Sequence, residues 1–207
     1  MGLLSLLLNN PIAFILIAIP LMYAIIFHEL AHGYVAYRLG DPTAKHLGRL
    51  SLNPLKHLDP LGTLMLFLVG FGWAKPVPIN FSYIQDYRKG MILVSSAGII
   101  MNMILAFLSL FLYSLLNLPQ SSVFAMVLQV FAKINIILAA FNLIPIPPLD
   151  GSKILLGFSP ASVQAILLRL ERFGFFIVIT LLYFNILDPV INFLQTVILS
   201  LINALLP

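Results

Sequence analysis

The segment Ile25-Ile26-Phe27-His28-Glu29-Leu30-Ala31-His32 places two imidazoles and one carboxylate inside a long apolar run. Residues four apart in an α-helix are rotated by only about 40° and displaced by about 6 Å, so His28 and His32 share one face. A helix uses this spacing to hold one zinc ion, and Glu29 is then free to act as a base on water. Ionisable side chains are rare inside lipid and usually functional there. The segment therefore predicts a metal site rather than a structural histidine pair.

The composition of the whole chain predicts an integral membrane protein. Of its 207 residues, 61% are apolar and 9% are charged, and the mean hydropathy is +1.06. Soluble globular domains contain about 25% charged residues, so a soluble globular protein is excluded. The chain has no cysteine, so any metal must be held by histidine and carboxylate groups. The N-terminal residues carry no lysine or arginine, so we expect no cleavable signal peptide.

The hydropathy pattern predicts an all-α polytopic membrane protein with about five transmembrane helices. Apolar stretches long enough to cross the membrane lie at residues 12–38, 90–116, 123–144, 165–187 and 190–206. We expect one membrane-embedded domain over residues 1–207, with a core at about residues 12–160 and two additional helices over residues 161–207.

The more polar stretch at residues 39–89 predicts a membrane-inserted loop with short β-strand character. Its segment at residues 48–54 alternates in polarity with a period of two, which favours a short strand. Its apolar patch at residues 61–71 is too short to cross a bilayer. Non-helical backbone is tolerated at membrane depth only where it is buried in protein or lines a polar cavity, so we expect this loop to be covered by the rest of the protein or to face such a cavity.

The distribution of basic residues predicts how the chain is oriented in the membrane. Of eleven lysines and arginines, seven lie at residues 38–89, from the end of the first span to the start of the second, and three at residues 153–172, around the connection of the third and fourth. The positive-inside rule makes that side cytoplasmic, with the N-terminus outside and the C-terminus inside. His28 lies ten residues before Arg38, about 15 Å along a helix, so the site should lie in the hydrocarbon layer nearer the cytoplasmic face.

Asp150 is the candidate third ligand, because a catalytic zinc site needs three protein ligands and one open position. It follows Pro145-Ile146-Pro147-Pro148, which stops the third span. Asp150 could equally be the N-cap of a short helix starting at Gly151, and the two roles are not exclusive. Two neutral imidazoles and the carboxylates of Asp150 and Glu29 would neutralise a zinc ion, which favours the ligand role.

Two motifs, in the same order along the chain, resemble the zinc-ligand motifs of the site-2 protease family of intramembrane zinc metalloproteases. The first is His28-Glu29-Leu30-Ala31-His32, and the second is Asn142-x-x-Pro145-x-Pro147-x-x-Asp150-Gly151. Three further patterns resemble the small prokaryotic branch, which has no PDZ or CBS domain: Leu52-Asn53-Pro54, His57-x-Asp59-Pro60-x-Gly62 and Gly72-Trp73-Ala74-Lys75-Pro76-Val77-Pro78. The resemblance covers about residues 15–160. Gly98-Ile99-Ile100-Met101-Asn102 keeps the Gly and Asn of a family stretch, with Ile99 in place of its Pro.

The resemblance implies a zinc-dependent intramembrane endopeptidase. His28, His32 and Asp150 would bind one zinc ion per chain, and Glu29 would be the catalytic base. The implied partners are a transmembrane protein substrate and the lipid bilayer of a prokaryotic plasma membrane, with no nucleic acid. Asn102 and Asn142 are candidates for binding the substrate backbone or the oxyanion, and their alternative role is hydrogen bonding between helices. An unwound substrate segment could pair as a strand along residues 61–78.

Two other functions are compatible with intramembrane His and Asp residues. A metal transporter needs no base beside its ligand, so Glu29 argues against that class. A catalytically inactive binder of membrane helices would be expected to have lost one of the four site residues, and all four are present.

Three further polar residues receive no role in the site. His46 and His57 are expected at the surface of the polar loop. Lys133 lies inside the third span, one turn after Gln129, and has no assigned role.

Overall fold

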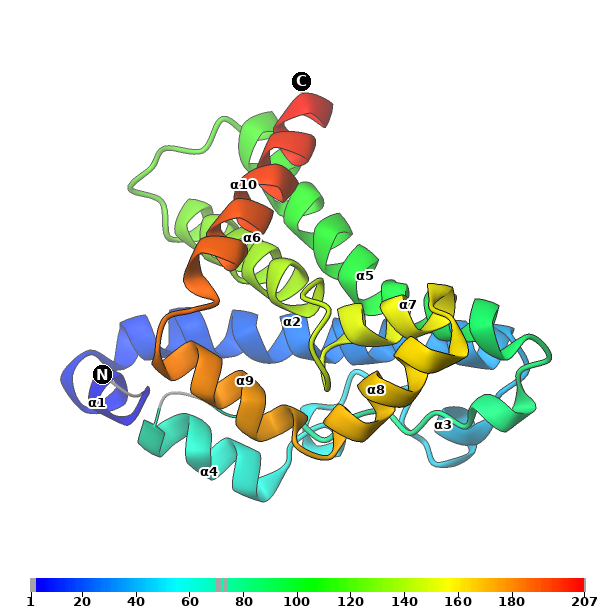
Figure 1. The fold of residues 1–207 in the computed structure, drawn as a ribbon. Coiled ribbons are helices and arrows are strands. Elements are labelled where there is room, and N and C mark those ends of the chain that lie inside the picture. Colours follow the sequence, from blue (N-terminus) through cyan, green and yellow to red (C-terminus); the bar gives the residue numbers. More distant parts are fainter. Residues whose placement is uncertain (1–2, 70–71, 73, 207) are drawn as a thin grey trace.

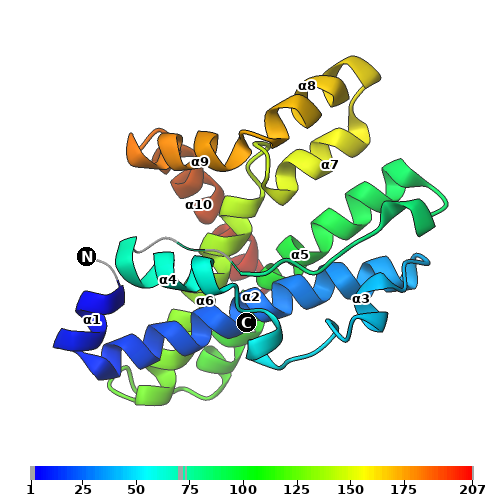
Figure 2. The same ribbon diagram turned by 90° about the horizontal axis from the view of Figure 1, so that it is seen from below.

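The computed structural model describes residues 3–69, 72 and 74–206, and all the regular secondary-structure elements within them are helices (Figures 1 and 2). The α-helices are α1 (Leu3–Asn9), α2 (Pro11–Arg38), α3 (Thr43–His46), α4 (Pro60–Val69), α5 (Tyr87–Leu115), α6 (Val123–Asn142), α7 (Asp150–Phe158), α8 (Ala161–Glu171), α9 (Gly174–Tyr183) and α10 (Asp188–Leu205). Two 3-10 helices, η1 (Pro54–Lys56) and η2 (Phe81–Tyr83), lie in the polar stretch.

Four of the described helices are long and apolar enough to cross a membrane: α2, α5, α6 and α10. They match four of the five predicted spans. The remaining one, at residues 165–187, is divided between α8 and α9, which lie end to end in both views (Figures 1 and 2). Arg169, Glu171 and Arg172 interrupt the apolar run at that junction. The prediction of about five transmembrane helices is therefore not confirmed.

The polar stretch contains short helices and extended backbone. Its predicted β-strand character is not confirmed, since the described residues there form one isolated bridge, between Leu58 and Ala74, and no strand. The apolar patch forms α4, a helix of ten residues that is too short to cross, as expected. Residues 74–80 then run extended along α2. Gly70, Phe71 and Trp73 of the predicted loop lie outside the described residues.

Side chains at the ends of the long helices fix where each helix begins. Asn10, Asp86 and Ser122 accept hydrogen bonds from the backbone N–H groups of Ala13, Lys89 and Ala125, at 3.0, 3.0 and 3.4 Å. Such caps satisfy donors that a helix start leaves without a partner. Helix α6 ends at Asn142, and the prolines that follow prevent its continuation. The chain therefore turns back, and α7 starts beside α5.

Helix α5 is the centre of the bundle and contacts α2, α6, α7 and α10. In Figure 1, α5, α6 and α10 rise on one side of α2, while α4 and α9 lie on the other. The buried core between α5, α6 and α10 contains several alanines, among them Ala106, Ala139 and Ala140. Small residues let transmembrane helices approach closely. This packing holds the face of α5 that contains Gly98 and Asn102 against α2.

Candidate active site

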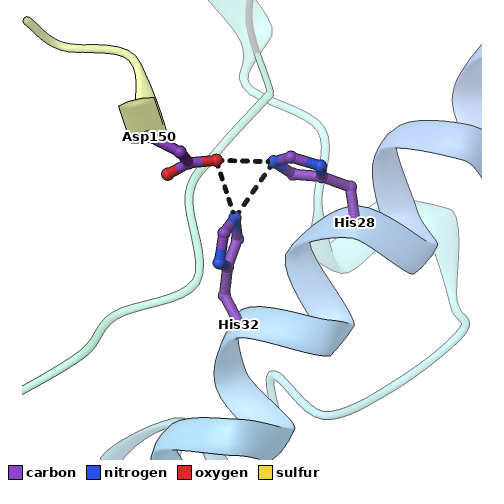
Figure 3. Close-up of side chains that lie close together, drawn as sticks. All are labelled: His28, His32 and Asp150. Carbon is purple, nitrogen blue, oxygen red and sulfur yellow. Dashed lines mark hydrogen bonds and ion pairs between the residues drawn. The ribbon is translucent and has the colours of Figure 1, made fainter. Parts of the chain in front are cut away.

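Three ligand atoms converge at one point (Figure 3). The Nε2 atoms of His28 and His32 lie 3.0 Å apart, and each lies 3.1 Å from Oδ2 of Asp150. All three residues are buried. The histidines come from one face of α2, as their spacing predicts, and Asp150 is the first residue of α7. Two imidazole nitrogens and one carboxylate oxygen fit the donor set of a zinc site with an open position.

The Asp150 side chain faces the histidines and does not cap its own helix. Leu149 is the N-cap residue of α7, and no side chain caps this helix start. The other carboxylate oxygen of Asp150 lies 4.0 Å from Nζ of Lys153. Burial alone would raise the pKa of the Asp150 carboxyl, but hydrogen bonds and charge from His28 and His32 hold this pKa below its usual range. Of the two roles open for Asp150, the geometry favours the ligand.

The second nitrogen of each imidazole is also engaged. Nδ1 of His28 lies 2.6 Å from Oδ1 of Asn102, and Nδ1 of His32 lies 2.7 Å from the carbonyl oxygen of Val94. Both partners are acceptors, so each Nδ1 donates, and in a neutral ring the Nε2 lone pair would then be available to a metal ion at the point where the ligands meet. Such hydrogen bonds fix the tautomer and the ring orientation of metal-binding histidines.

Asn102 is fully enclosed and belongs to a chain of amides. Its Nδ2 donates to Oδ1 of Asn135 at 2.8 Å, and Nδ2 of Asn135 donates to the Phe131 carbonyl at 2.8 Å. Asn102 and Asn135 are both 0% exposed. The structure therefore brings Asn102 to His28 rather than to the cavity described below. Asn142, in contrast, lines that cavity and donates to the carbonyl of Leu138 in its own helix.

Gly98 allows α5 to lie directly against the two imidazoles. A Cβ atom built at this position would overlap Nε2 of His32 and Cε1 of His28. These atoms belong to side chains that are fixed by other hydrogen bonds, so they cannot move aside cheaply. Only glycine leaves the space that the rings occupy.

Gly98→Ala is therefore expected to disrupt the site. Overpacking a core typically costs about 1–3 kcal/mol, and here the strain falls on the two imidazoles, so zinc affinity should drop by at least about tenfold. The measurement is zinc content after dialysis against graded chelator. Ile100→Ala is the matched control, since Ile100 is 53% exposed on the same helix. Equal zinc retention in both variants would contradict the packing argument.

Glu29 lies beside the ligands but faces the extended segment at residues 74–80. Its Oε2 accepts a hydrogen bond from the backbone N–H of Val77 at 2.8 Å. This contact orients the carboxylate and leaves its second oxygen without a hydrogen-bond partner among the described residues. A half-buried carboxylate held in this way can accept a proton from water at the cavity.

Two buried charged residues fix the same extended segment at its ends. Oδ2 of Asp41 accepts from the N–H of Asn80 at 2.7 Å, and Nη2 of Arg49 donates to the Lys75 carbonyl at 2.7 Å. Sequence reasoning assigns neither residue a role, because charged residues in a polar loop are normally solvated.

The position of His57 in the same region differs from the prediction. It is 2% exposed rather than at the surface, and its ring contacts the Ser51 carbonyl at 2.7 Å, whereas His46 is exposed as expected.

A cavity of about 410 Å³ opens at the three ligand atoms. Its lining combines the predicted ligands and base with Asn142 and residues of the extended segment: His28, Glu29, His32, Pro76, Val77, Ile79, Phe81, Val94, Ser95, Asn142, Pro148, Leu149, Asp150, Lys153 and Glu171. A cavity with polar groups at its base and an extended backbone along one side suits a peptide segment.

Comparison with known proteins identifies the family. The protein named "Putative zinc metalloprotease YwhC" from Bacillus subtilis is 40% identical over 200 residues, which cover 91% of each chain. The chain belongs to peptidase family M50. The model of that family matches residues 117–184, which include Asp150. No solved structure gives a significant match.

Further relatives extend the M50 comparison. "Putative zinc metalloprotease Rip2" from Mycolicibacterium smegmatis is 31% identical over 187 residues, covering 86% of this chain and 69% of its own. "Putative zinc metalloprotease MJ0611" from Methanocaldococcus jannaschii is 32% identical over 149 residues, covering 70% and 71% of the two chains. The predicted resemblance to site-2 proteases and the predicted class of enzyme, a peptidase, are thus confirmed.

Proposed function

We propose that this M50 peptidase is a zinc-dependent endopeptidase that hydrolyses a peptide bond in or near a transmembrane segment of a membrane protein. The observation that carries the proposal is the convergence of His28, His32 and Asp150 at one cavity beside Glu29. The two histidines lie on a helix that is itself long and apolar enough to cross a membrane. The zinc metalloprotease names of the relatives support the choice of metal.

One zinc ion per chain is the proposed stoichiometry. His28, His32 and Asp150 would hold it, and their donor atoms lie 3.0–3.1 Å apart, close enough to share one small ion. Bound zinc supplies a Lewis acid that activates water and polarises the carbonyl of the peptide bond. With the Asp150 and Glu29 carboxylates the site would be neutral, which lowers the cost of placing it in lipid.

The residues around the ligands have distinct proposed roles. Glu29, held by the Val77 N–H, takes the proton of the attacking water and passes it to the leaving amine. Asn142 lines the cavity and is the candidate for binding the substrate backbone or the oxyanion. Asn102 was a second candidate for that contact, but its amide is engaged by His28 and Asn135, so we assign it the positioning of the His28 ring.

The substrate is proposed to enter as an unwound segment. Carbonyl groups inside a helix are already hydrogen-bonded, so the peptide bond must leave helical geometry before it is attacked. The extended backbone at residues 74–80 passes the cavity and is fixed by Asp41 and Arg49. A substrate strand could pair with it through backbone hydrogen bonds.

The proposed topology places the loop after α2 and the segment around α7 in the cytoplasm of a prokaryotic cell, with the N-terminus outside. In one membrane-embedded domain over residues 1–207, α8 and α9 would together make a broken crossing, since α9 is apolar but only ten residues long. A fifth crossing of this kind would put the C-terminus in the cytoplasm and the metal site nearer the cytoplasmic face.

Reporter fusions test this topology. Fusions at Lys45 and Lys153 should both report the cytoplasm, and a fusion at Gln120 should report the outside. Reporters at Lys45 and Lys153 on opposite sides would contradict the topology. A fusion after Leu205 separates the broken crossing from a half-crossing, because only a full crossing by α8 and α9 puts it in the cytoplasm.

Cleavage in liposomes tests the proposed function. Purified protein, reconstituted with a panel of spanning peptides that contain Gly or Asn near one end, should yield two fragments by mass spectrometry. Peptides with such helix-weakening residues unwind more easily than a continuous leucine helix, which should be cut more slowly. A zinc chelator should stop cleavage, and added zinc should restore it. Zinc accumulation inside the liposomes without any fragments would instead identify a carrier.

A further inference from the structure

A second hollow, which we call the α6/α10 groove, lies between α5, α6 and α10, away from the active-site cavity. Its volume is about 530 Å³. Helices α6 and α10 contact each other beside it and cross in the view of Figure 1. Four of its side chains are a lysine and three amides: Gln129 and Lys133 from α6, and Asn192 and Gln195 from α10. The lining is otherwise apolar apart from Thr196, whose hydroxyl donates to the Asn192 carbonyl.

The head groups of these four side chains have no partner in the part of the chain that the structure describes. None of them takes part in a hydrogen bond or ion pair there, although together they offer an ammonium and three amides. In water such groups would be solvated and need no explanation. In hydrocarbon each polar group without a partner costs several kcal/mol, so a partner is expected.

Lys133 lies too deep for its ammonium to reach the membrane surface. It is ten residues after Val123 and nine before Asn142, so about 14–15 Å of helix separate it from either end of α6. A lysine near a helix end can extend its side chain to the interface, but one at mid-span cannot. Lipid phosphates lie at that interface, so the partner of Lys133 should be an acidic group at the same depth.

We propose that the α6/α10 groove binds a transmembrane helix of another protein that has an Asp or Glu near the middle of its span. Its carboxylate would pair with Lys133, and the amides of Gln129, Asn192 and Gln195 would satisfy neighbouring polar groups. A second copy of this chain does not fit. Of its seven acidic residues, only Glu29 and Glu171 lie inside a helical crossing described above, and both line the active-site cavity rather than a free helix face.

The test uses synthetic spanning helices of leucine and alanine that differ only at the central residue, which is Glu, Gln or Lys. Energy transfer between labelled protein and labelled helix is measured in neutral phosphatidylcholine liposomes. The Glu helix should bind about tenfold more tightly than the Gln helix. Lys133→Met should abolish this difference, and Lys133→Glu should instead prefer the Lys helix. Zinc content shows that each variant is folded, so the result does not depend on cleavage.

Lys45→Met, which changes an exposed lysine of α3 far from the groove in the sequence, is the matched control and should keep the preference for the Glu helix. Equal binding of the Glu and Gln helices to the unchanged protein would overturn the proposal, as would an undiminished preference in Lys133→Met. Two further results would also overturn it. In the first, added phosphatidylglycerol displaces the Glu helix, and this lipid binds the unchanged protein but not Lys133→Met. The other is labelling of Lys133 by a water-soluble amine reagent without capture of any helix, which would indicate a water-filled groove.

Discussion

Replacing His28 or His32 by alanine is expected to reduce the zinc content of the purified protein to a small fraction of that of the unchanged protein. Each substitution leaves two of the three convergent ligands. Loss of a residue that merely orients a metal ligand already costs about 10–100-fold in affinity, and loss of the ligand itself should cost more. Elemental analysis after dialysis against a weak chelator measures the effect, and cleavage of a spanning peptide should fall with it.

His46→Ala is the control for this experiment, because His46 is an exposed histidine eight residues beyond the end of α2. It should retain zinc and activity. Undiminished zinc in both His28→Ala and His32→Ala would refute the assignment of the site. Loss of zinc in His46→Ala as well would point to nonspecific binding by surface histidines.

Glu29→Gln is expected to separate catalysis from metal binding. Glutamine keeps the size of the side chain and can still accept the Val77 N–H, but it cannot take a proton from water. Zinc content and folding should therefore stay unchanged. The rate of cleavage should fall by about 10²–10⁴-fold, the usual contribution of a general base.

Asp150→Asn should behave differently, because an amide is a poor zinc ligand. Metal affinity and activity should drop together in this variant. The two variants are compared by measuring zinc content and cleavage of the same peptide side by side. The assignment of base and ligand would be wrong if Glu29→Gln lost as much zinc as Asp150→Asn. It would also be wrong if Glu29→Gln still cleaved the peptide at nearly the original rate.

The convergence of His28, His32 and Asp150 could be predicted because local periodicity and residue chemistry select these three residues. Histidines four apart must share a face of any helix, and the cost of burying charge selects very few positions for a third ligand. The roles of Asn102, Asp41 and Arg49 could not be predicted in this way. Each depends on which backbone or ring lies opposite it, and the distance along the chain to that partner is not encoded by any local pattern.

The limits of hydropathy are clearest at two places in the fold. Residues 165–187 are apolar on average, yet charged residues at the α8–α9 junction divide the run into two shorter helices. His57 is polar and lies in a polar loop, yet tertiary packing buries it. Average polarity predicts the environment of a segment, and an individual side chain departs from it where neighbours supply its hydrogen bonds.

The distance along the chain between the candidate metal ligands bears on how the protein is made. Asp150 contacts His28 across a separation of 122 residues, so the ribosome must add that many residues after His28 before the third candidate ligand exists. At the usual speed of translation this takes roughly 6–24 s. During that interval the nascent chain has its histidine pair but no third ligand, and Gly98 and Asn102 have yet to meet the rings. The candidate metal site is therefore completed only late in biosynthesis, so the unfinished chain lacks the ligand set that the proposed activity needs.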